Sequence, residues 1–258
     1  MNLSSISTRS LAGRLLRLPL RLVPKGTPMP ILQGPMRGRR WLAGALNHGC
    51  WLGSYETDTQ ERIGALIGAG DVVYDVGANA GFYTLLAATL VGARGRVVSF
   101  EPVPSNLEVL RRHIALNALD NVEVIEAAVA DRDGTAAFAA DGGHGATARL
   151  SESGNLRVRV TTLDTLRSEG SIPAPTLIKI DVEGAEYAVL RGAERLLRDT
   201  LPYLIVELHT PEMDRLCPAF LRNLGYAIEP FHAADTRAVW GDTIPSEVWG
   251  AFVALPPR

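Results

Sequence analysis

Short apolar segments alternate with helix-length amphipathic segments through most of the chain. From about residue 56 onward, each short apolar run has the composition of a buried strand, and each run is followed by a turn signal or a helical pattern. The predicted strands are residues 71–76, 96–100, 122–125, 157–162, 176–180, 203–208, 226–230 and 248–254. The predicted helices are residues 81–91, 105–117 (with Ser105 as a candidate cap), 185–198 and 212–224. Strands that alternate with helices predict an α/β fold of the doubly wound type, with a mostly parallel sheet covered on both faces.

Residues 1–55 have a different pattern and are predicted to form an N-terminal extension, a helix plus a linker, ahead of a folded domain of residues 56–258. Near the start, leucines recur at helical spacing and arginines fall on an adjoining face, while Pro19 should kink or shorten the helix. The leucines are Leu11, Leu15, Leu18 and Leu22, and the arginines are Arg14, Arg17 and Arg21. Such a helix could lie on an anionic membrane surface or a partner, or dock its leucines on its own domain. The stretch is too short and too charged for a secretory signal or a membrane span, and residues 24–38 are predicted to be a loop or linker.

Composition and charge narrow the class of protein. The 258 residues are 47% hydrophobic and 21% charged, which excludes wholesale disorder. The two cysteines, Cys50 and Cys217, are far apart, so a disulfide scaffold and a zinc ribbon are excluded and a reducing, cytoplasmic compartment is expected. The formal net charge is −2, yet residues 1–55 hold eight basic side chains and no acid, which leaves the other residues at −10. An acidic main body argues against a nucleic-acid partner.

The first candidate site follows the strand at residues 71–76. In a doubly wound sheet, ligands bind outside the carboxyl ends of the strands, and here the turn reads Asp-Val-Gly-Ala-Asn-Ala-Gly from Asp75 to Gly81. Gly77 and Gly81 allow a tight turn and a close approach of a ligand to backbone N–H groups. Asn79 stands where a dinucleotide fingerprint has its second glycine, which weakens a nicotinamide interpretation. Glu101, at the end of the next strand, is placed to accept both hydroxyls of a ribose, so the pair of features favours an adenosine-bearing ligand.

Further charged residues follow two later strands. Lys179 lies inside an apolar strand and is one of two lysines in the chain, so it needs a carboxylate partner if it is buried. Asp181 and Glu183 come directly after this strand, where they could face the same crevice or simply cap the next helix. His209 follows the strand after that, behind the carboxylate of Glu207, and is either structural or catalytic.

These segments resemble the FkbM family of S-adenosylmethionine-dependent methyltransferases. The segments that carry the resemblance are VVYDVGANAGFYTLLAA, VVSFEPVPSNLEVLRRHIALN, VTTLDTL and LIKIDVEGAEYAVLRGAERLL, between about residues 56 and 209. The resemblance implies a seven-stranded, Rossmann-like class I methyltransferase fold over residues 56–258, with S-adenosyl-L-methionine as methyl donor. Carried over by position, the residues implied to bind the donor are Asp75, Gly77, Asn79 and Gly81 at the methionine end, Glu101 at the ribose, residues 126–128 with Ala128 at the adenine, and Asp181 beside the amino group and sulfonium. Ala127 stands where other methyltransferases place an acid opposite the adenine amine.

The resemblance also implies methyl transfer to oxygen. An amine-methylating enzyme would prefer an Asn/Asp-Pro-Pro-Tyr turn where this chain has Asp-Val-Glu-Gly, and members of the family are associated with hydroxyls of sugars and polyketides. A hydroxyl nucleophile benefits from a general base, for which Asp181, Glu183 and His209 are candidates, with Lys179 orienting the carboxylates. The expected acceptor is a hydroxyl of a sugar or other glycan, a glycolipid or a secondary metabolite. The paired acids could instead hold a divalent metal chelated by a diol acceptor.

Two other functions are compatible with parts of the pattern. A nicotinamide-dependent oxidoreductase on a related sheet is disfavoured by Asn79 and by the lack of a Tyr-x-x-x-Lys pair. A non-catalytic module that binds an adenosine ligand or docks on a membrane would have no need of Asp181 and Glu183. The glycine-rich loop at residues 141–147, which contains His144, could be a lid over the acceptor or a plain surface loop.

Overall fold

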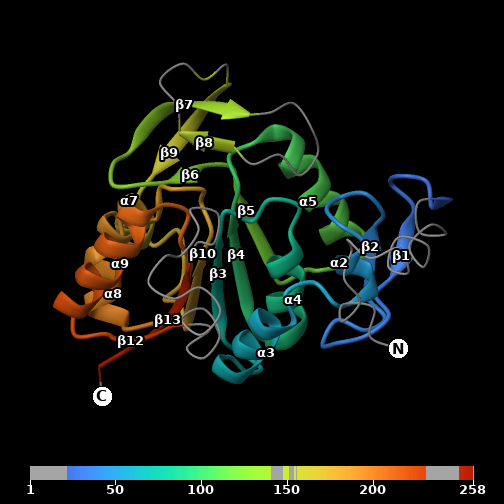
Figure 1. Ribbon diagram of the computed structural model, residues 1–258, viewed down its shortest axis with the longest axis horizontal. Helices are drawn as coiled ribbons and strands as arrows, with labels where there is room; N and C mark the ends of the chain where they lie inside the picture. The colour runs from blue at the N-terminus through green and yellow to red at the C-terminus, as the bar shows by residue number, and fades with distance from the viewer. Residues whose placement is uncertain (1–21, 141–147, 151–153, 155, 231–249, 258) are drawn as a thin grey trace.

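The computed structural model describes residues 22–140, 148–150, 154, 156–230 and 250–257 (Figure 1). Its central feature is a seven-stranded sheet with the strand order β12-β13-β11-β10-β3-β4-β5. The strands are β3 (Val72–Val76), β4 (Arg96–Phe100), β5 (Val122–Ile125), β10 (Leu177–Ile180), β11 (Tyr203–Glu207), β12 (Ala227–Pro230) and β13 (Ala251–Leu255). Strands β11, β10, β3, β4 and β5 pair in parallel, and β13 is antiparallel to both of its neighbours. The predicted α/β fold with a mostly parallel sheet is confirmed.

Helices cover both faces of this sheet, because alternate residues of each strand point to opposite sides. Val73 and Leu177 pack in one core cluster with α3 (Thr57–Leu66), α4 (Phe82–Val91) and part of α5 (Pro104–Leu116). Tyr74 and Ile178 pack in a second cluster with helices α6 to α9. These helices are α6 (Leu163–Ser168), α7 (Glu186–Arg191), α8 (Glu194–Thr200) and α9 (Pro211–Asn223). The sheet therefore lies between two apolar layers, with its carboxyl ends free to build a site.

The face toward α4 becomes polar near the carboxyl ends of the strands. By the alternation of the strands, Asp75, Ser99, Lys179 and Glu207 share the side of Val73 and Leu177, two or more positions further along their strands. Thr84 of α4 donates a hydrogen bond to Asp75 Oδ2 at 2.6 Å, and its hydroxyl also lies 2.8 Å from Ser99 Oγ. A buried polar layer thus lies directly beneath the end of the sheet where a ligand would bind.

Residues 22–55 pack against the same core. Strands β1 (Pro28–Pro30) and β2 (Arg40–Leu42) form an antiparallel pair, followed by the short helix α2 (Gly49–Leu52), beside α5 in Figure 1. The buried indole of Trp41 stacks on the ring of His113 with the centroids 3.8 Å apart. His113 Nε2 accepts a hydrogen bond from the backbone N–H of Leu42 at 2.9 Å, and its Nδ1 lies 2.8 Å from the carbonyl oxygen of Ala80. The predicted loop or linker at residues 24–38 is therefore wrong for residues 28–36, which contain β1 and two core residues, Ile31 and Met36.

A second, four-stranded sheet lies across the carboxyl ends of the first (Figure 1). It has the order β6-β9-β7-β8, built from β6 (Ala128–Val129), β7 (Gly134–Ala140), β8 (Ala148–Leu150) and β9 (Leu156–Thr161). The strand predicted at residues 157–162 exists as β9, but it belongs to this sheet rather than to the central one. The predicted N-terminal helix (except Leu22), the loop 141–147 and His144 lie outside the described residues.

Two helix predictions need correction. The helix predicted at residues 185–198 is divided into α7 and α8 at Gly192, where a Cβ atom would come well under 3.0 Å from the carbonyl oxygen of Ala130. This close approach of two backbones needs glycine, which is a poor residue inside a helix. Ser105 is not the cap of α5, since the helix begins at Pro104 and its cap residue, Val103, makes no side-chain cap. No helix among the described residues is long and apolar enough to cross a membrane.

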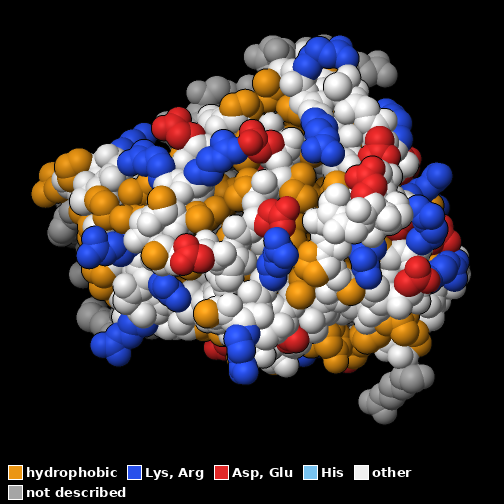
Figure 2. Space-filling model, turned by 180° about the vertical axis from the view of Figure 1, so that it is seen from behind, with side chains coloured by type: hydrophobic (Ala, Val, Ile, Leu, Met, Phe, Trp, Pro, Cys, Tyr) orange, Lys and Arg blue, Asp and Glu red, His pale blue; other side chains and the backbone are white. Residues whose placement is uncertain are grey.

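Charged side chains on the surface are interspersed. On the face opposite to the view of Figure 1, Lys and Arg side chains are spread widely with Asp and Glu among them (Figure 2). Exposed pairs such as Arg96 with Glu123, 3.0 Å apart, contribute only about 0–1 kcal/mol each to stability. The charged side chains that shape the candidate site are instead the buried ones at the ends of β10 and β11.

Candidate active site

The turn after β3 is shaped by close contacts between backbones. Gly77 has a φ of 87°, and a Cβ atom there would come well under 3.0 Å from the carbonyl oxygen of Asp181. The backbone N–H of Asp181 in turn donates to the carbonyl oxygen of Val76 at 3.0 Å. A residue with a side chain at position 77 would therefore push apart the ends of β3 and β10. The turn and Asp181 form one unit.

Glu101 is held in place at the end of β4 by backbone donors. Its side chain accepts hydrogen bonds from the backbone N–H of Asn79 at 2.7 Å and from that of Val103 at 2.8 Å. The side-chain amide of Asn106 lies 3.4 Å away as a further donor. Burial raises the pKa of Glu101 to about 7, although these three hydrogen bonds favour the charged form. The carboxylate therefore faces the site with a fixed position and a pKa near neutrality.

A pocket of about 660 Å³, counting its open mouth, lies between these strand ends and the second sheet. Five of the residues that the sequence analysis assigned to the donor line it, namely Gly77, Asn79, Glu101, Ala128 and Asp181. The lining also includes Glu183, Ala127 and two residues that the sequence analysis did not single out, Asn106 and Phe138. No motif marked Phe138, because the second sheet that carries it was not predicted.

Three other residues assigned to the donor site do not line this pocket. Asp75 is 2% exposed and lies beneath the pocket, bonded to Thr84, rather than on its wall. Gly81 is also absent from the lining, and its open side instead faces Leu110 of α5, which a Cβ atom there would overlap. Glu126, in the stretch 126–128 assigned to the adenine, turns its side chain to solvent and pairs with Arg111.

The pocket fits S-adenosylmethionine, the donor that the resemblance implies. Asn79 has a φ of 48°, and its side-chain oxygen Oδ1 is buried with no hydrogen-bond partner among the described residues, so it can accept from a donor group such as an amine. Glu101 presents a carboxylate for the ribose hydroxyls, and Ala127, Ala128 and Phe138 supply an apolar wall for a flat ring. Gly77, Asn79, Glu101 and Asp181 are the residues that would hold the polar parts of the donor.

Lys179 neutralises the carboxylates beside this pocket. Its Nζ lies 2.9 Å from Asp181 Oδ2 and 3.1 Å from Glu207 Oε1, and it stands 4.2 Å above the ring of Tyr83. Burial alone would lower the pKa of Lys179, but the charges of Asp181, Glu207 and Asp75 outweigh it and raise that pKa. Burial also raises the pKa of Glu207 to about 7. The pKa of Asp181 is lowered, since the charge of Lys179 outweighs the burial of Asp181.

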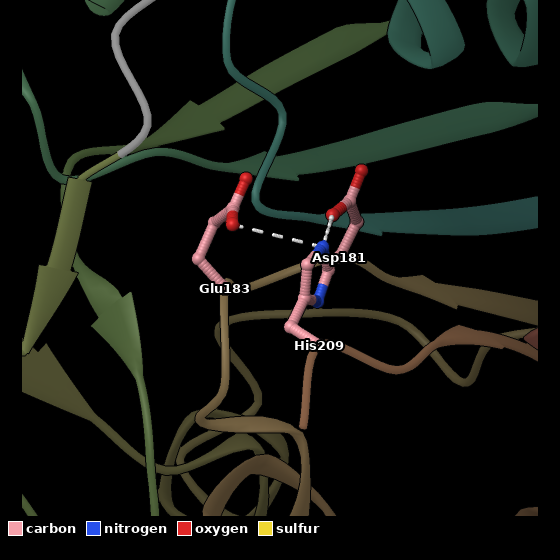
Figure 3. A group of neighbouring side chains, drawn as sticks. All are labelled: Asp181, Glu183 and His209. Carbon is pink, nitrogen blue, oxygen red and sulfur yellow. Dashed lines mark ion pairs between the residues drawn. The ribbon is translucent and has the colours of Figure 1, made fainter. Parts of the chain in front are cut away.

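Asp181, Glu183 and His209 gather at the mouth of the pocket (Figure 3). His209 Nε2 lies between the two carboxylates, 3.4 Å from Asp181 Oδ1 and 3.7 Å from Glu183 Oε2. The three residues come from the turns after β10 and β11, and each offers a ligand atom within 4.8 Å of the others. Asp181 and Glu183 line the pocket, and His209 lies behind them. The sequence analysis named all three, and the structure brings them together.

Glu186 is a residue of this cluster that the sequence analysis missed. It is fully buried at the start of α7, and its Oε1 accepts hydrogen bonds from His209 Nδ1 at 2.7 Å and from the backbone N–H of Gly184 at 2.8 Å. Burial lowers the pKa of His209, but Glu186, Asp181 and Glu183 outweigh it and raise that pKa to about 9. An acid in the first turn of a helix is ordinarily a partner of the helix dipole, so the sequence held no signal for this role.

Comparisons with known proteins show that the chain is similar to a family of methyltransferases. The Methyltransferase FkbM domain matches residues 75–228. The hexuronic acid methyltransferase AglP of Haloferax volcanii is 30% identical over 144 residues, which cover 54% of this chain and 56% of that protein. The 31-O-demethyl-FK506 methyltransferase FkbM of Streptomyces tacrolimicus is 29% identical over 180 residues, 57% of this chain and 69% of that one. The crystal structure of methyltransferase FkbM from Methylobacillus flagellatus superposes with a TM-score of 0.51 at 21% identity over 73% of this chain and 44% of that one, a likeness of fold.

Proposed function

The chain belongs to the FkbM methyltransferase family, whose domain spans residues 75–228, and from this premise we propose that it methylates a hydroxyl oxygen of a sugar, a glycolipid or a secondary metabolite. That it is an enzyme with S-adenosylmethionine as methyl donor follows from the family. The choice of oxygen and of the acceptor class is the proposal. The oxidoreductase and the non-catalytic module considered from the sequence do not agree with the family.

One observation carries the proposal for oxygen. The carboxylates of Asp181 and Glu183 line the same pocket as the donor-binding residues Gly77, Asn79 and Glu101. When bound, S-adenosylmethionine supplies a methyl group that leaves its sulfur for a nucleophile, with the electron pair of the broken carbon–sulfur bond staying on the sulfur. A hydroxyl is a weak nucleophile and must lose its proton as the new bond forms, so two negative groups beside the reacting position favour that loss.

The other residues of the cluster keep these carboxylates in place. Lys179 binds Asp181 Oδ2 and leaves Oδ1 facing the mouth of the pocket. His209 carries a proton at neutral pH, because its pKa is raised to about 9, so the free enzyme does not offer it as a base. We therefore assign to Asp181 and Glu183 the activation of the acceptor hydroxyl, and to Lys179 and His209 the positioning of the two carboxylates.

The names of the relatives support an oxygen acceptor on a sugar or a metabolite. One is named a hexuronic acid methyltransferase and another a 31-O-demethyl-FK506 methyltransferase. The chain spans about half of the first of these proteins, so its own acceptor follows from neither name. Uronic acid glycosides, neutral glycosides and hydroxylated macrolides are the acceptors to try first.

The experiment is an acceptor screen with methyl-labelled S-adenosylmethionine, in which the product is identified by mass spectrometry and the methyl position by NMR. We expect a methyl ether, and we expect Asp181→Asn to lower kcat about a hundredfold or more, a usual loss for a group that assists proton removal. Asp199→Asn, an exposed change in α8, is the matched control and should leave kcat unchanged. Methyl transfer to nitrogen or carbon, or a near wild-type rate for Asp181→Asn, would contradict the proposal.

A further inference from the structure

We propose that Asp181, Glu183 and His209 bind a divalent cation at the mouth of the pocket, and that this cation binds the acceptor hydroxyl. The inference rests on the proposed function, since it assigns the means by which the hydroxyl is activated. Three features of the cluster support it, namely the distances between the ligand atoms, the division of the two Asp181 oxygen atoms between partners, and the buried partner of His209. Each of these features is independent of the relatives' names.

The spacing of the three ligand atoms suits a cation. Nitrogen and oxygen ligands bind divalent metals such as Zn²⁺ and Mg²⁺ at roughly 2.0–2.2 Å, so two adjacent ligands of one metal lie about 3 Å apart. The observed separations of His209 Nε2 from Asp181 Oδ1 and Glu183 Oε2 are 3.4 and 3.7 Å, and the whole set lies within 4.8 Å. Small side-chain rotations are enough to admit the cation. A mixed set of two carboxylates and one imidazole suits Mn²⁺ and its neighbours in the first transition row.

Asp181 divides its two oxygen atoms between two partners. Oδ2 accepts from Lys179 Nζ at 2.9 Å, whereas Oδ1 is the atom nearest His209 Nε2. Lys179 is 2% exposed and also pairs with Glu207, so its charge is committed inside the protein. The cation at the mouth would therefore bind Oδ1 without displacing Lys179.

Glu186 supplies the outer support that a metal-bound histidine usually has. His209 Nδ1 donates to Glu186 Oε1 at 2.7 Å, which directs Nε2 toward Asp181 and Glu183. A metal-ligating histidine almost always donates its other ring N–H to a carboxylate or carbonyl in this way. Glu186 is fully buried, and its second oxygen, Oε2, has no hydrogen-bond partner in the part of the chain that the structure describes. Burying a carboxylate in this manner is costly, so its place behind the histidine needs a reason.

The same contacts would arise if a protonated His209 were only a counter-ion for the carboxylates. The two arrangements differ by one proton and one metal ion, because a cation on Nε2 replaces the proton there. They also differ in the shape of the mouth, since three protein ligands leave open positions on a cation for the acceptor. Two neighbouring oxygens of a diol or of a hydroxy acid would fill two such positions.

The cation changes the chemistry at the acceptor hydroxyl by lowering its pKa. As the new carbon–oxygen bond forms, the hydroxyl proton passes to water, and the electron pair of the broken carbon–sulfur bond stays on the sulfur. The products are the methyl ether, S-adenosylhomocysteine and one proton. No oxidant or reductant takes part.

The test uses Mn²⁺ alone with the full chain, measured by calorimetry and by electron paramagnetic resonance. We expect one Mn²⁺ per chain, and a nitrogen coupling from a histidine in the pulsed spectrum. His209→Asn should abolish the coupling and weaken Mn²⁺ binding at least tenfold, with unchanged affinity for S-adenosylhomocysteine, since His209 does not line the pocket. Glu186→Gln should weaken Mn²⁺ binding about tenfold, as loss of an outer partner commonly does.

Glu183→Gln provides a second variant in case the histidine variant fails to fold, because the Glu183 side chain is 35% exposed and the substitution keeps its shape. It should also weaken Mn²⁺ binding. His48→Asn and Glu194→Gln, in α2's cap and in α8, are matched controls that should leave Mn²⁺ binding unchanged.

Three results would overturn the cation site: no Mn²⁺ bound to the wild-type chain, Mn²⁺ bound without nitrogen coupling, or binding unaffected by His209→Asn. Methyl ether formation at an undiminished rate in EDTA would also overturn it and leave the proposed function standing. If Mn²⁺ bound at this site but no acceptor gave a methyl ether, the cation site would stand and the proposed function would be overturned.

Discussion

Two parts of the candidate site hold their carboxylates by different means. On the donor wall, which is Gly77, Asn79 and Glu101, the carboxylate of Glu101 is held chiefly by backbone N–H groups. In the charged cluster, which is Lys179, Asp181, Glu183, Glu186 and His209, the carboxylates are held chiefly by Lys179 and His209, although Glu186 also accepts a hydrogen bond from a backbone N–H. The first arrangement depends on the path of the chain, and the second on pairs of side chains from separate strands.

This difference predicts how substitutions affect the donor wall and the charged cluster. Backbone donors remain when a side chain is removed, so a substitution in the donor wall should weaken donor binding through that one residue and leave its neighbours in place. In the charged cluster, the removal of one partner leaves another buried charge without compensation, and the cost reaches the whole fold. The pKa shifts follow the same division, because burial raises the pKa of Glu101 whereas Lys179 lowers that of Asp181.

The largest expected effect is on stability and comes from Lys179→Met. Methionine fills a similar space but leaves Asp75, Asp181 and Glu207 without their shared cation. Breaking a buried ion pair costs about 3–5 kcal/mol, and we expect a loss of about 3 kcal/mol at pH 7, since Asp181 and Glu207 are partly exposed. Urea denaturation measures the free energy of unfolding.

A pH series and a matched control sharpen this result. The unpaired carboxylates of the Lys179→Met variant would have raised pKa values in the folded state, so the deficit should shrink as the pH falls toward 5. Arg96→Met removes an exposed cation from its pair with Glu123 and should change the free energy of unfolding by less than about 1 kcal/mol. A Lys179→Met deficit equal to that of Arg96→Met would show that the cluster is not held by its charges.

The second effect is on donor binding and comes from Gly77→Ala. The added Cβ atom would overlap the carbonyl oxygen of Asp181, so the ends of β3 and β10 must separate. We expect calorimetry to show affinity for S-adenosylhomocysteine about a hundredfold weaker, or binding lost. Gly38→Ala is the matched control, because Gly38 has a similar φ of 89° but no atom of the described residues within 4 Å of an added Cβ atom. Gly38→Ala should lose some stability through backbone strain, about 1 kcal/mol, and bind normally. Equal affinities in the two variants would contradict this account.

The sequence predicted that Gly77, Asn79 and Glu101 lie together, and they line one pocket, because the signals for this wall are local. The glycine turn after one strand and the acid at the end of the next lie at fixed offsets from two strongly apolar runs, and the parallel pairing of β3 with β4 places them side by side. The same logic placed Asp181 and His209 at one edge of the sheet. It did not indicate that Asp75 and Gly81 lie outside the pocket lining, since a position in a motif does not tell whether the residue lines the pocket or supports it from beneath.

The features that could not be predicted depend on contacts between distant segments. Glu186 contacts His209 across 23 positions in the sequence, and Trp41 stacks on His113 across a longer interval. Neither segment shows a pattern that specifies its partner. The second sheet was missed because its short strands pair with one another rather than with the central sheet, and a period of two in one strand does not indicate which sheet it joins.

The third effect is a pH dependence of donor binding, which we expect to come from Glu101 in the donor wall. The pKa of Glu101 is raised to about 7, and the protonated acid is a poorer acceptor for the ribose hydroxyls. Binding of S-adenosylhomocysteine should therefore weaken as the pH falls through 7, by about tenfold between pH 8 and pH 6, because one unit below the pKa leaves about a tenth of the carboxyl ionised. Glu101→Gln, which is neutral at every pH, should bind weakly with a flatter profile. Parallel profiles for the two proteins would assign the pH dependence to another group.

The smallest effect comes from Asn79→Gly, and it separates what the backbone does from what a side chain does on the donor wall. Asn79 has a φ of 48°, which glycine adopts more easily, so the substitution should not lower the free energy of unfolding by more than about 1 kcal/mol. Its backbone N–H still donates to Glu101. The variant loses the unpartnered Oδ1, worth about 1 kcal/mol of binding free energy, so affinity for S-adenosylhomocysteine should fall about fivefold. Ala118→Gly, at a φ of 49° and on the surface, relieves the same kind of strain far from the pocket and should bind normally. If Asn79→Gly kept full affinity, only backbone groups and Glu101 of the donor wall would bind the donor. The donor wall would then depend on the backbone, and the charged cluster on side chains, even more than the hydrogen bonds indicate.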